Sequence, residues 1–200
     1  ESDPYVISGY LINGTGNDHG IEIRDTSLHI EISYNLITHA EFGEGIIVRD
    51  CSNISFSNNT VRNSFGPRSI KISDSNSIKL RENLVENYML QHGIWIRTCN
   101  DLEVSSNTIR GYTGLGLYIS EGSKIEVMEN IVEDIGGAGM AFGDLDGLLI
   151  KGNHVRNSGG FGIHCYYSSD NVELYGNVLE GNQFKLDNIE STIITPNNTV

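Results

Sequence analysis

The residues with the clearest potential for ligand chemistry are cations and aromatic rings that recur at a regular spacing. Trp95, the only tryptophan of the chain, lies one step of about 24 residues after Lys71 and one step before Tyr118. Aromatic faces suit the C–H face of a sugar ring, and arginine and lysine suit the carboxylate of an acidic sugar. We therefore expect a carbohydrate ligand. The residues expected to bind it are Arg49, Arg68, Trp95, His164 and Tyr166.

The spacing of these residues follows an internal repeat that runs through the chain. A glycine or serine followed by alternating apolar residues, such as GIWI from Gly93, recurs in phase with an asparagine and with a second apolar segment. The asparagine column is Asn35, Asn59, Asn83, Asn107, Asn130, Asn153 and Asn177. A repeat of this length cannot bury an apolar face alone, so the pattern predicts a stacked solenoid.

Each repeat contains three short strand-like segments, in which every second side chain points inward. Parallel crossovers are almost always right-handed. The sequence therefore predicts an all-β, right-handed, single-stranded parallel β-helix with about eight coils, forming one domain over residues 1–200. The first strand-like segment of each repeat contributes two inward columns. One is Ile21, Ile46, Ile70, Ile94, Leu117, Met140 and Ile163; the other is Ile23, Val48, Ile72, Ile96, Ile119, Phe142 and Cys165.

With its Gly-apolar-x-apolar strands, the Asp or Ser turns that follow them and its asparagine column, the sequence resembles the pectin-lyase-like superfamily of parallel β-helices. It looks closest to the carbohydrate-binding and sugar-hydrolase-type repeats, and the resemblance covers nearly the whole chain. It implies that ligands lie along the outer face of strand one and the turn before it. Members include lyases, hydrolases, epimerases and non-enzymes, so the resemblance is specific for fold and not for function.

Uronate lyases and epimerases of this fold type neutralise a carboxylate and then remove the adjacent proton. By that resemblance Lys71 or His92 would be the base and Tyr118 the acid, with Arg97 and Arg49 as neutralising cations. The turns before strand one are short, however, and enzymes of this architecture usually carry long loops there. Two interpretations stay open. One is an extracellular module that binds or processes polysaccharide, as a lyase, epimerase or glycoside hydrolase if it is an enzyme; the other is a non-catalytic scaffold of a cell-surface or surface-layer protein.

Three further columns have structural explanations. The asparagines are expected to form an inward hydrogen-bonded ladder at a turn. The residues that stand three positions after each of these asparagines alternate in charge, and they are expected to pair between coils: Thr38, Arg62, Glu86, Arg110, Glu133, Arg156 and Glu180. The turn after strand one carries Asp25, Asp50, Asp74, Thr98, Glu121 and Asp144. Turn chemistry explains this last column best, although stacked carboxylates could also bind calcium; no other cofactor is indicated.

The three cysteines do not suggest a metal motif or a disulfide framework. Cys51 and Cys99 share one turn column two coils apart, a separation of roughly 9–10 Å that a disulfide cannot bridge. Cys165 is expected in the core. The sequence therefore predicts three free thiols.

Charge and composition limit the kinds of partner that the protein can bind. A net charge of -13 repels phosphate backbones, so we expect no nucleic-acid partner, and an anionic ligand would need a local basic patch. No apolar run approaches the roughly 20 residues of a membrane span. Glycosylation motifs at Asn13, Asn53, Asn58 and Asn197 favour an extracellular or cell-surface location. Uncapped solenoid ends predict further domains or end-to-end self-association.

Overall fold

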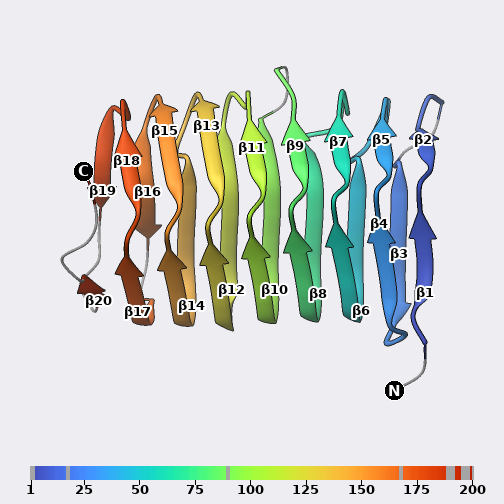
Figure 1. Ribbon diagram of the computed structural model, residues 1–200, viewed down its shortest axis with the longest axis horizontal. Helices are drawn as coiled ribbons and strands as arrows, with labels where there is room; N and C mark the ends of the chain where they lie inside the picture. The colour runs from blue at the N-terminus through green and yellow to red at the C-terminus, as the bar shows by residue number, and fades with distance from the viewer. Residues whose placement is uncertain are drawn as a thin grey trace.

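The computed structural model describes residues 3–16, 19–88, 91–166, 169–187, 192–194 and 199, so the motif at Asn197 lies outside the described residues. The fold is an all-β parallel solenoid of about seven turns, close to the eight expected. Its strands stack side by side along the long axis, from β1 at the N-terminal end to β19 and β20 at the other (Figure 1).

Two parallel sheets make up the solenoid. The larger sheet contains β1 Tyr5–Ser8, β3 Ile21–Thr26, β4 Ile30–Ser33, β6 Ile46–Ser57, β8 Arg68–Arg81, β10 His92–Ser105, β12 Leu115–Met128, β14 Met140–Lys151, β16 Phe161–Tyr166, β17 Asp170–Tyr175, β19 Phe184–Asp187 and β20 Thr192–Ile194. The smaller sheet contains the third strand of each coil: β2 Leu11–Asn13, β5 Leu36–Thr38, β7 Thr60–Arg62, β9 Leu84–Glu86, β11 Thr108–Arg110, β13 Ile131–Ile135, β15 His154–Ser158 and β18 Val178–Glu180.

The short apolar segments in the sequence suggested that a turn separates strands one and two. In the central coils the two strands instead form one continuous ladder. In β8 the corner consists of two residues with positive φ, Asp74 (52°) and Ser77 (52°). The same corner position has a positive φ throughout the acidic column, at Asp25, Asp50, Asp74, Thr98, Glu121 and Asp144. Aspartate is among the residues that adopt this conformation most readily. The structure therefore confirms the turn explanation for the acidic column.

The asparagine column forms the predicted ladder. The side-chain amide of Asn83 donates to Oδ1 of Asn107 at 2.9 Å, and that of Asn107 donates to Oδ1 of Asn130 at 3.0 Å. All seven asparagines are buried. The left-handed conformation belongs to the residue before each asparagine, such as Glu82 (55°), rather than to the asparagine itself.

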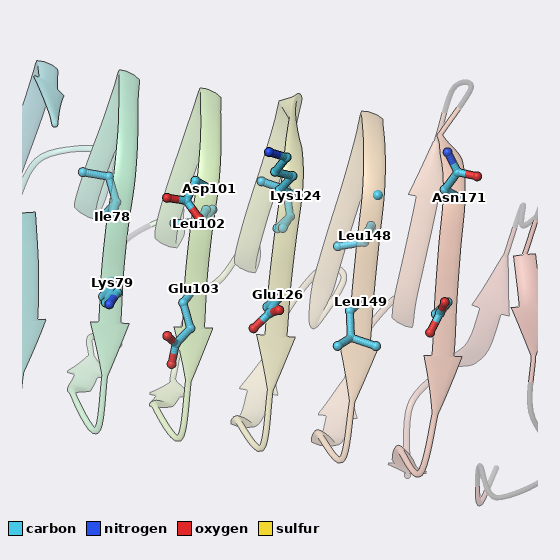
Figure 2. Close-up of a pocket in the computed structure, with 13 residues that line it drawn as sticks. Ile78, Lys79, Asp101, Leu102, Glu103, Lys124, Glu126, Leu148, Leu149 and Asn171 are labelled. Carbon is cyan, nitrogen blue, oxygen red and sulfur yellow. The ribbon is translucent and has the colours of Figure 1, made fainter. Parts of the chain in front are cut away.

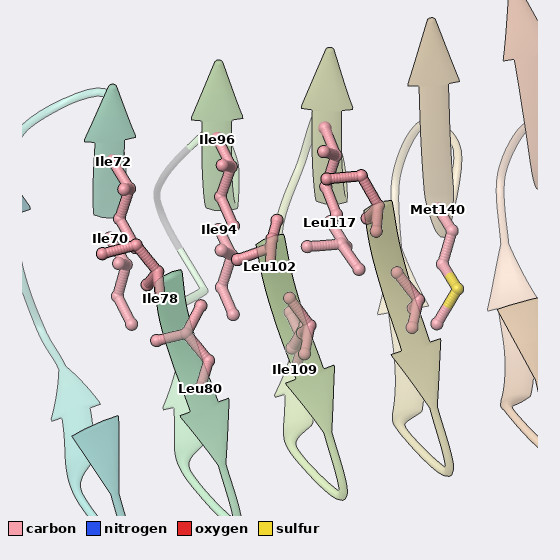
Figure 3. Close-up of a cluster of buried hydrophobic side chains, with 14 of the residues drawn as sticks. Ile70, Ile72, Ile78, Leu80, Ile94, Ile96, Leu102, Ile109, Leu117 and Met140 are labelled. Atoms are coloured by element: carbon pink, nitrogen blue, oxygen red, sulfur yellow. The ribbon is translucent and has the colours of Figure 1, made fainter. Parts of the chain in front are cut away.

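The core is a continuous column of apolar side chains between the two sheets (Figure 3). Both inward columns predicted from strand one are buried, and β-branched residues predominate. Glycine begins strand one in most coils, because a Cβ at Gly93 would lie 2.5 Å from the carbonyl oxygen of Gly116 in the next coil; Ser69 stands at this position in β8. The repeat thus keeps glycine where neighbouring backbones approach most closely.

The outward charge column also pairs between coils, as expected. Arg110 contacts Glu86 at 2.7 Å and Glu133 at 3.7 Å, and Arg156 also pairs with Glu133. Thr38 departs from the pattern because it is buried. Such surface pairs contribute little energy individually, but they favour one register of the coils.

Cys51, Cys99 and Cys165 are buried free thiols. Ser75 lies between the first two: it pairs with Cys99 in the ladder, and its hydroxyl accepts a hydrogen bond from the Cys51 amide. Burial raises the pKa of the Cys99 thiol to about 11, so it stays protonated at neutral pH. In the described part of the chain, no helix is long and apolar enough to cross a membrane.

Candidate functional site

The outer face of strand one has the register that the sequence predicted. Parallel pairing aligns Lys71 in β8 with Trp95 in β10, and Trp95 with Tyr118 in β12. The column then continues through Ala141 in β14 to His164 in β16. Because the ladder fixes this order, side chains far apart in sequence lie one coil apart on a single face.

A hollow of about 450 Å³ opens on this face between β6, β8 and β10. Four cations and one carboxylate line it together with the tryptophan: Arg49, Arg68, Lys71, Arg97, Asp74 and Trp95, with Ser73 beside them. The chain has only 13 lysines and arginines against 26 acidic residues, so this cluster is a local basic patch on an acidic protein. Such a patch attracts anions despite the net charge.

Trp95 lies at the centre of an aromatic row. Its ring stacks on Tyr118 with 3.9 Å between centroids, and the His92 ring is 4.9 Å away. The Arg68 guanidinium lies 5.0 Å from the Trp95 ring centroid. Trp95 lies on the outer face, as the register requires, but its side chain is only partly exposed. The reason is that Tyr118, His92 and Arg68 cover part of the ring.

The remaining candidate residues extend the row toward the C-terminal coils. Tyr166 lies 6.2 Å from Tyr118 between ring centroids, although the two are two coils apart. The coil between them carries only Ala141 on this face, which leaves room for that approach. His164 packs edge-on against Tyr166 at 4.3 Å. The structure thus places the hollow and the His164–Tyr166 pair on one face, linked by Tyr118.

The four cations of the hollow differ in whether they are already paired. Arg97 donates two hydrogen bonds to Oε1 of Glu121, which lowers the pKa of that carboxyl below its usual value. Arg68 forms a 3.0 Å ion pair with Glu44. Within the described residues, Arg49 and Lys71 form no ion pair. The two uncompensated charges are therefore those of Arg49 and Lys71.

His92 is held by the backbone of the next coil. Its Nδ1 accepts a hydrogen bond from the Leu115 amide at 3.1 Å, which places the proton of the neutral imidazole on Nε2. Partial burial lowers the pKa of His92, and the nearby Arg68 charge lowers it further. The neutral ring therefore presents a hydrogen-bond donor at Nε2.

We predict that His92 titrates below the ordinary histidine value. Because folding lowers its pKa, protonation favours the unfolded chain, and the free energy of unfolding should fall as the pH falls through the range between the ordinary and the lowered value. NMR titration of the ring protons measures the midpoint directly. In Arg68→Met the midpoint should rise, because one of the two causes is removed. A midpoint at or above that of histidine in an unfolded peptide would contradict this description of the ring.

Three other hollows are less suited to an acidic ligand, including one near the N-terminal coils that is lined by His29, Asn53 and Asp101 with Lys79. The one on the outer face of strand two, about 600 Å³, carries Lys79 and Lys124 among a larger number of acidic side chains, including Asp101, Glu103 and Glu126 (Figure 2). Another lies along the turn column and is lined by Asp25, Asp50 and Asp74. No group of three or more histidine, cysteine or acidic side chains in the described residues is arranged to hold a metal ion. The basic hollow on strand one is therefore the best candidate site.

The comparisons with known proteins agree with the fold. The family model described as a right-handed β-helix region matches residues 44–199. The A-module of mannuronan C-5 epimerase AlgE4 from Azotobacter vinelandii superposes with a TM-score of 0.81 at 13% identity, over 96% of this chain and 58% of that one. A double mutant of the periplasmic alginate epimerase AlgG gives 0.62 at 14% identity, over 87% of this chain and 46% of that one.

The chain therefore spans about half the length of these two proteins. No protein of curated function matches its sequence. At 13–14% identity the structural likeness establishes the fold alone. The family is shown by the family model, which matches more than half of the chain. This chain belongs to the right-handed parallel β-helix family, the pectin-lyase-like type of solenoid.

Proposed function

We propose that the protein binds an acidic polysaccharide along the outer face of strand one, with the hollow beside Trp95 as the central subsite. The observation that carries this proposal is the presence of four cations and the only tryptophan in one hollow of a protein with a net charge of -13. An aromatic face next to cations binds both the C–H face and the carboxylate of a uronate. Likeness of fold to two epimerases named for mannuronan and alginate supports the same ligand class.

A polymer could follow the solenoid axis on this face. Successive coils are about 4.8 Å apart, comparable with the length of one sugar ring along its chain. One cation or aromatic ring per coil would then meet successive sugars, from Arg49 through Lys71 and Trp95 to Tyr118. His164 and Tyr166 would bind the polymer further along. An extracellular or cell-surface location is part of the same proposal.

Titration with alginate oligomers tests this function. Because Trp95 is the only tryptophan, its fluorescence reports binding at the hollow without a label. We expect saturable binding that weakens as salt is added, since ions screen the attraction between the cations and the uronates. Neutral cello-oligosaccharides of the same length should bind more weakly. Absence of binding to either ligand would reject the proposal and leave the scaffold interpretation.

Catalysis at the same site is a second candidate, which the likeness to two epimerases favours. Loss of the C-5 proton of a uronate to a base places negative charge on the carboxylate, where Arg49 and Arg97 could stabilise it. Return of a proton to the opposite face, for example from Tyr118, gives the C-5 epimer. Breaking of the bond between C-4 and the linking oxygen instead, with a proton passed to that oxygen, for example from Tyr118, gives a sugar with a double bond between C-4 and C-5. Lys71 lines the hollow and would act as the base in its uncharged form, whereas His92 presents a donor at Nε2.

NMR of the polymer after incubation distinguishes the two reactions. An epimerase changes the ratio of the two uronates without cutting the chain. A lyase produces unsaturated ends that absorb ultraviolet light. An unchanged polymer in the presence of measured binding would identify a binding module without catalysis.

A further inference from the structure

The turn before strand one contains a buried carboxylate, Glu44, which is only 6% exposed. Burial of a carboxylate is unfavourable unless a cation or several hydrogen bonds compensate its charge. Arg68, in the next coil, supplies that cation through Nη1 at 3.0 Å from Oε1. The other near neighbour is His19, whose Nδ1 lies 3.4 Å from Oε2.

His19 does not provide the compensating proton from that atom. Its Nδ1 already accepts a hydrogen bond from the Glu44 amide at 3.1 Å, so the neutral ring carries its proton on Nε2. Among the described residues, Arg68 is therefore the cation that compensates Glu44. This dependence restricts where the Arg68 side chain can lie.

The other side of Arg68 faces the binding site. Its guanidinium lies 5.0 Å from the Trp95 ring centroid, within the range of a cation–π contact, and it lines the hollow. Its Nε is buried and has no hydrogen-bond partner among the described residues. In the part of the chain that the structure describes, the guanidinium is thus held by its contacts with Glu44 and Trp95, and Glu44 supplies the directional one.

We propose that Glu44 is a positioning residue, whose buried carboxylate holds the Arg68 guanidinium over Trp95 and so fixes the floor of the hollow. This inference rests on the proposed binding of an acidic polysaccharide at that hollow. Glu44 does not contact the ligand in this arrangement. It acts through Arg68, which in turn holds the tryptophan ring in place in the lining of the hollow.

The variant Glu44→Gln separates positioning from simple electrostatics, because the two predict opposite results. Removing a negative charge beside a cationic hollow should strengthen binding of an anionic ligand if charge alone matters. If Glu44 positions Arg68, binding of an alginate oligomer should instead weaken, by about threefold to tenfold, as expected for loss of an ordered cation–π contact. Calorimetry at fixed salt measures the change. Tighter binding in the variant would overturn the proposal.

A second measurement needs no ligand and so stands apart from the proposed function. Acrylamide quenching of the single tryptophan should increase in Glu44→Gln, because the released Arg68 no longer covers the ring. The matched control is Glu103→Gln, which removes the same charge from a carboxylate paired with Arg81 on the outer face of strand two. It should leave quenching unchanged. Equal quenching in wild type and Glu44→Gln would reject the positioning role, whatever the protein binds.

If Glu44→Gln does not fold, Glu44→Asp provides the same test. Aspartate keeps the negative charge but draws the carboxylate back by one methylene group from Arg68, so quenching should increase although the charge of the turn is unchanged. Adding Glu44→Gln to Arg68→Met should cause no further loss of affinity beyond that of Arg68→Met alone, since Glu44 acts only through Arg68. An additional loss would show that Glu44 acts by another route.

Discussion

Replacing Asn107 with alanine should lower the free energy of unfolding by about 3–5 kcal/mol, because several buried polar groups lose their partners together at about 1–3 kcal/mol each. Asn107 is fully buried in the central part of the ladder. Its Oδ1 accepts hydrogen bonds from the backbone and the side-chain amide of Asn83, both at 2.9 Å. Its own amide donates to the Leu80 carbonyl at 2.8 Å and to Asn130. Alanine replaces none of these interactions.

Chemical denaturation of Asn107→Ala and of Asn100→Ala measures this effect against a matched control. Asn100 lies in the same coil, but it is exposed, and among the described residues its side chain bonds only to Asn76 and Ser123 in the adjoining coils. Its replacement should change stability by less than about 0.5 kcal/mol. Because each coil contacts only its neighbours, hydrogen exchange should increase mainly in the coils adjoining Asn107. A loss of under about 1 kcal/mol for Asn107→Ala would show that the ladder is not a main source of stability.

The fold could be predicted from the sequence because its register has only one favourable solution. A shift of one residue in the coil of β10, for example, would turn Ile94 and Ile96 outward and bring Trp95 and Arg97 inward. The asparagine column fixes the same register independently, since Asn107 must meet Asn83 and Asn130. The joining of strands one and two could not be predicted in this way, because it depends on the left-handed residues at the corner, such as Asp74 and Ser77.

The candidate site was predicted in composition but not in its internal pairing. In the sequence pattern Arg97 and Glu121 belong to different columns, which predicts no contact between them. The structure shows that the Arg97 side chain reaches Glu121 at the turn of the next coil. The pair of Glu44 and Arg68 had a usable signal, because opposite charges stand one coil apart before strand one, as they do in the ladder of Arg110 and Glu133. The partial burial of Trp95 depends on how side chains pack across coils, which the order of residues in a column does not specify.

The pairing in the hollow indicates which cations an acidic ligand should depend on. Arg97 and Arg68 already contact Glu121 and Glu44, so a carboxylate that binds them must compete with an internal partner. Arg49 and Lys71 have no such competitor among the described residues, and both line the hollow. We therefore expect them to provide most of the affinity for the uronate carboxylate.

Lys71→Ala and Arg49→Ala should each weaken binding of an alginate oligomer by about tenfold, and the double variant by up to about a hundredfold. These values follow from roughly 1.5–3 kcal/mol for a hydrogen bond to a charged group, taken at its lower end because the hollow is open to solvent. Calorimetric titration at constant ionic strength measures both. Binding of a neutral oligosaccharide should change much less, because stacking on Trp95 is retained.

Lys79→Ala is the control that distinguishes a specific contact from the general field of the protein. Lys79 lies in the same strand as Lys71, β8, but on the outer face of strand two, so its loss changes the net charge equally and leaves the hollow intact. If Lys79→Ala weakened binding as much as Lys71→Ala, the ligand would respond to overall charge alone. If Arg97→Ala proved more damaging than Lys71→Ala, the ligand would have displaced Glu121 from its arginine. The carboxylate subsite would then lie one coil further toward the C-terminus than the free structure indicates.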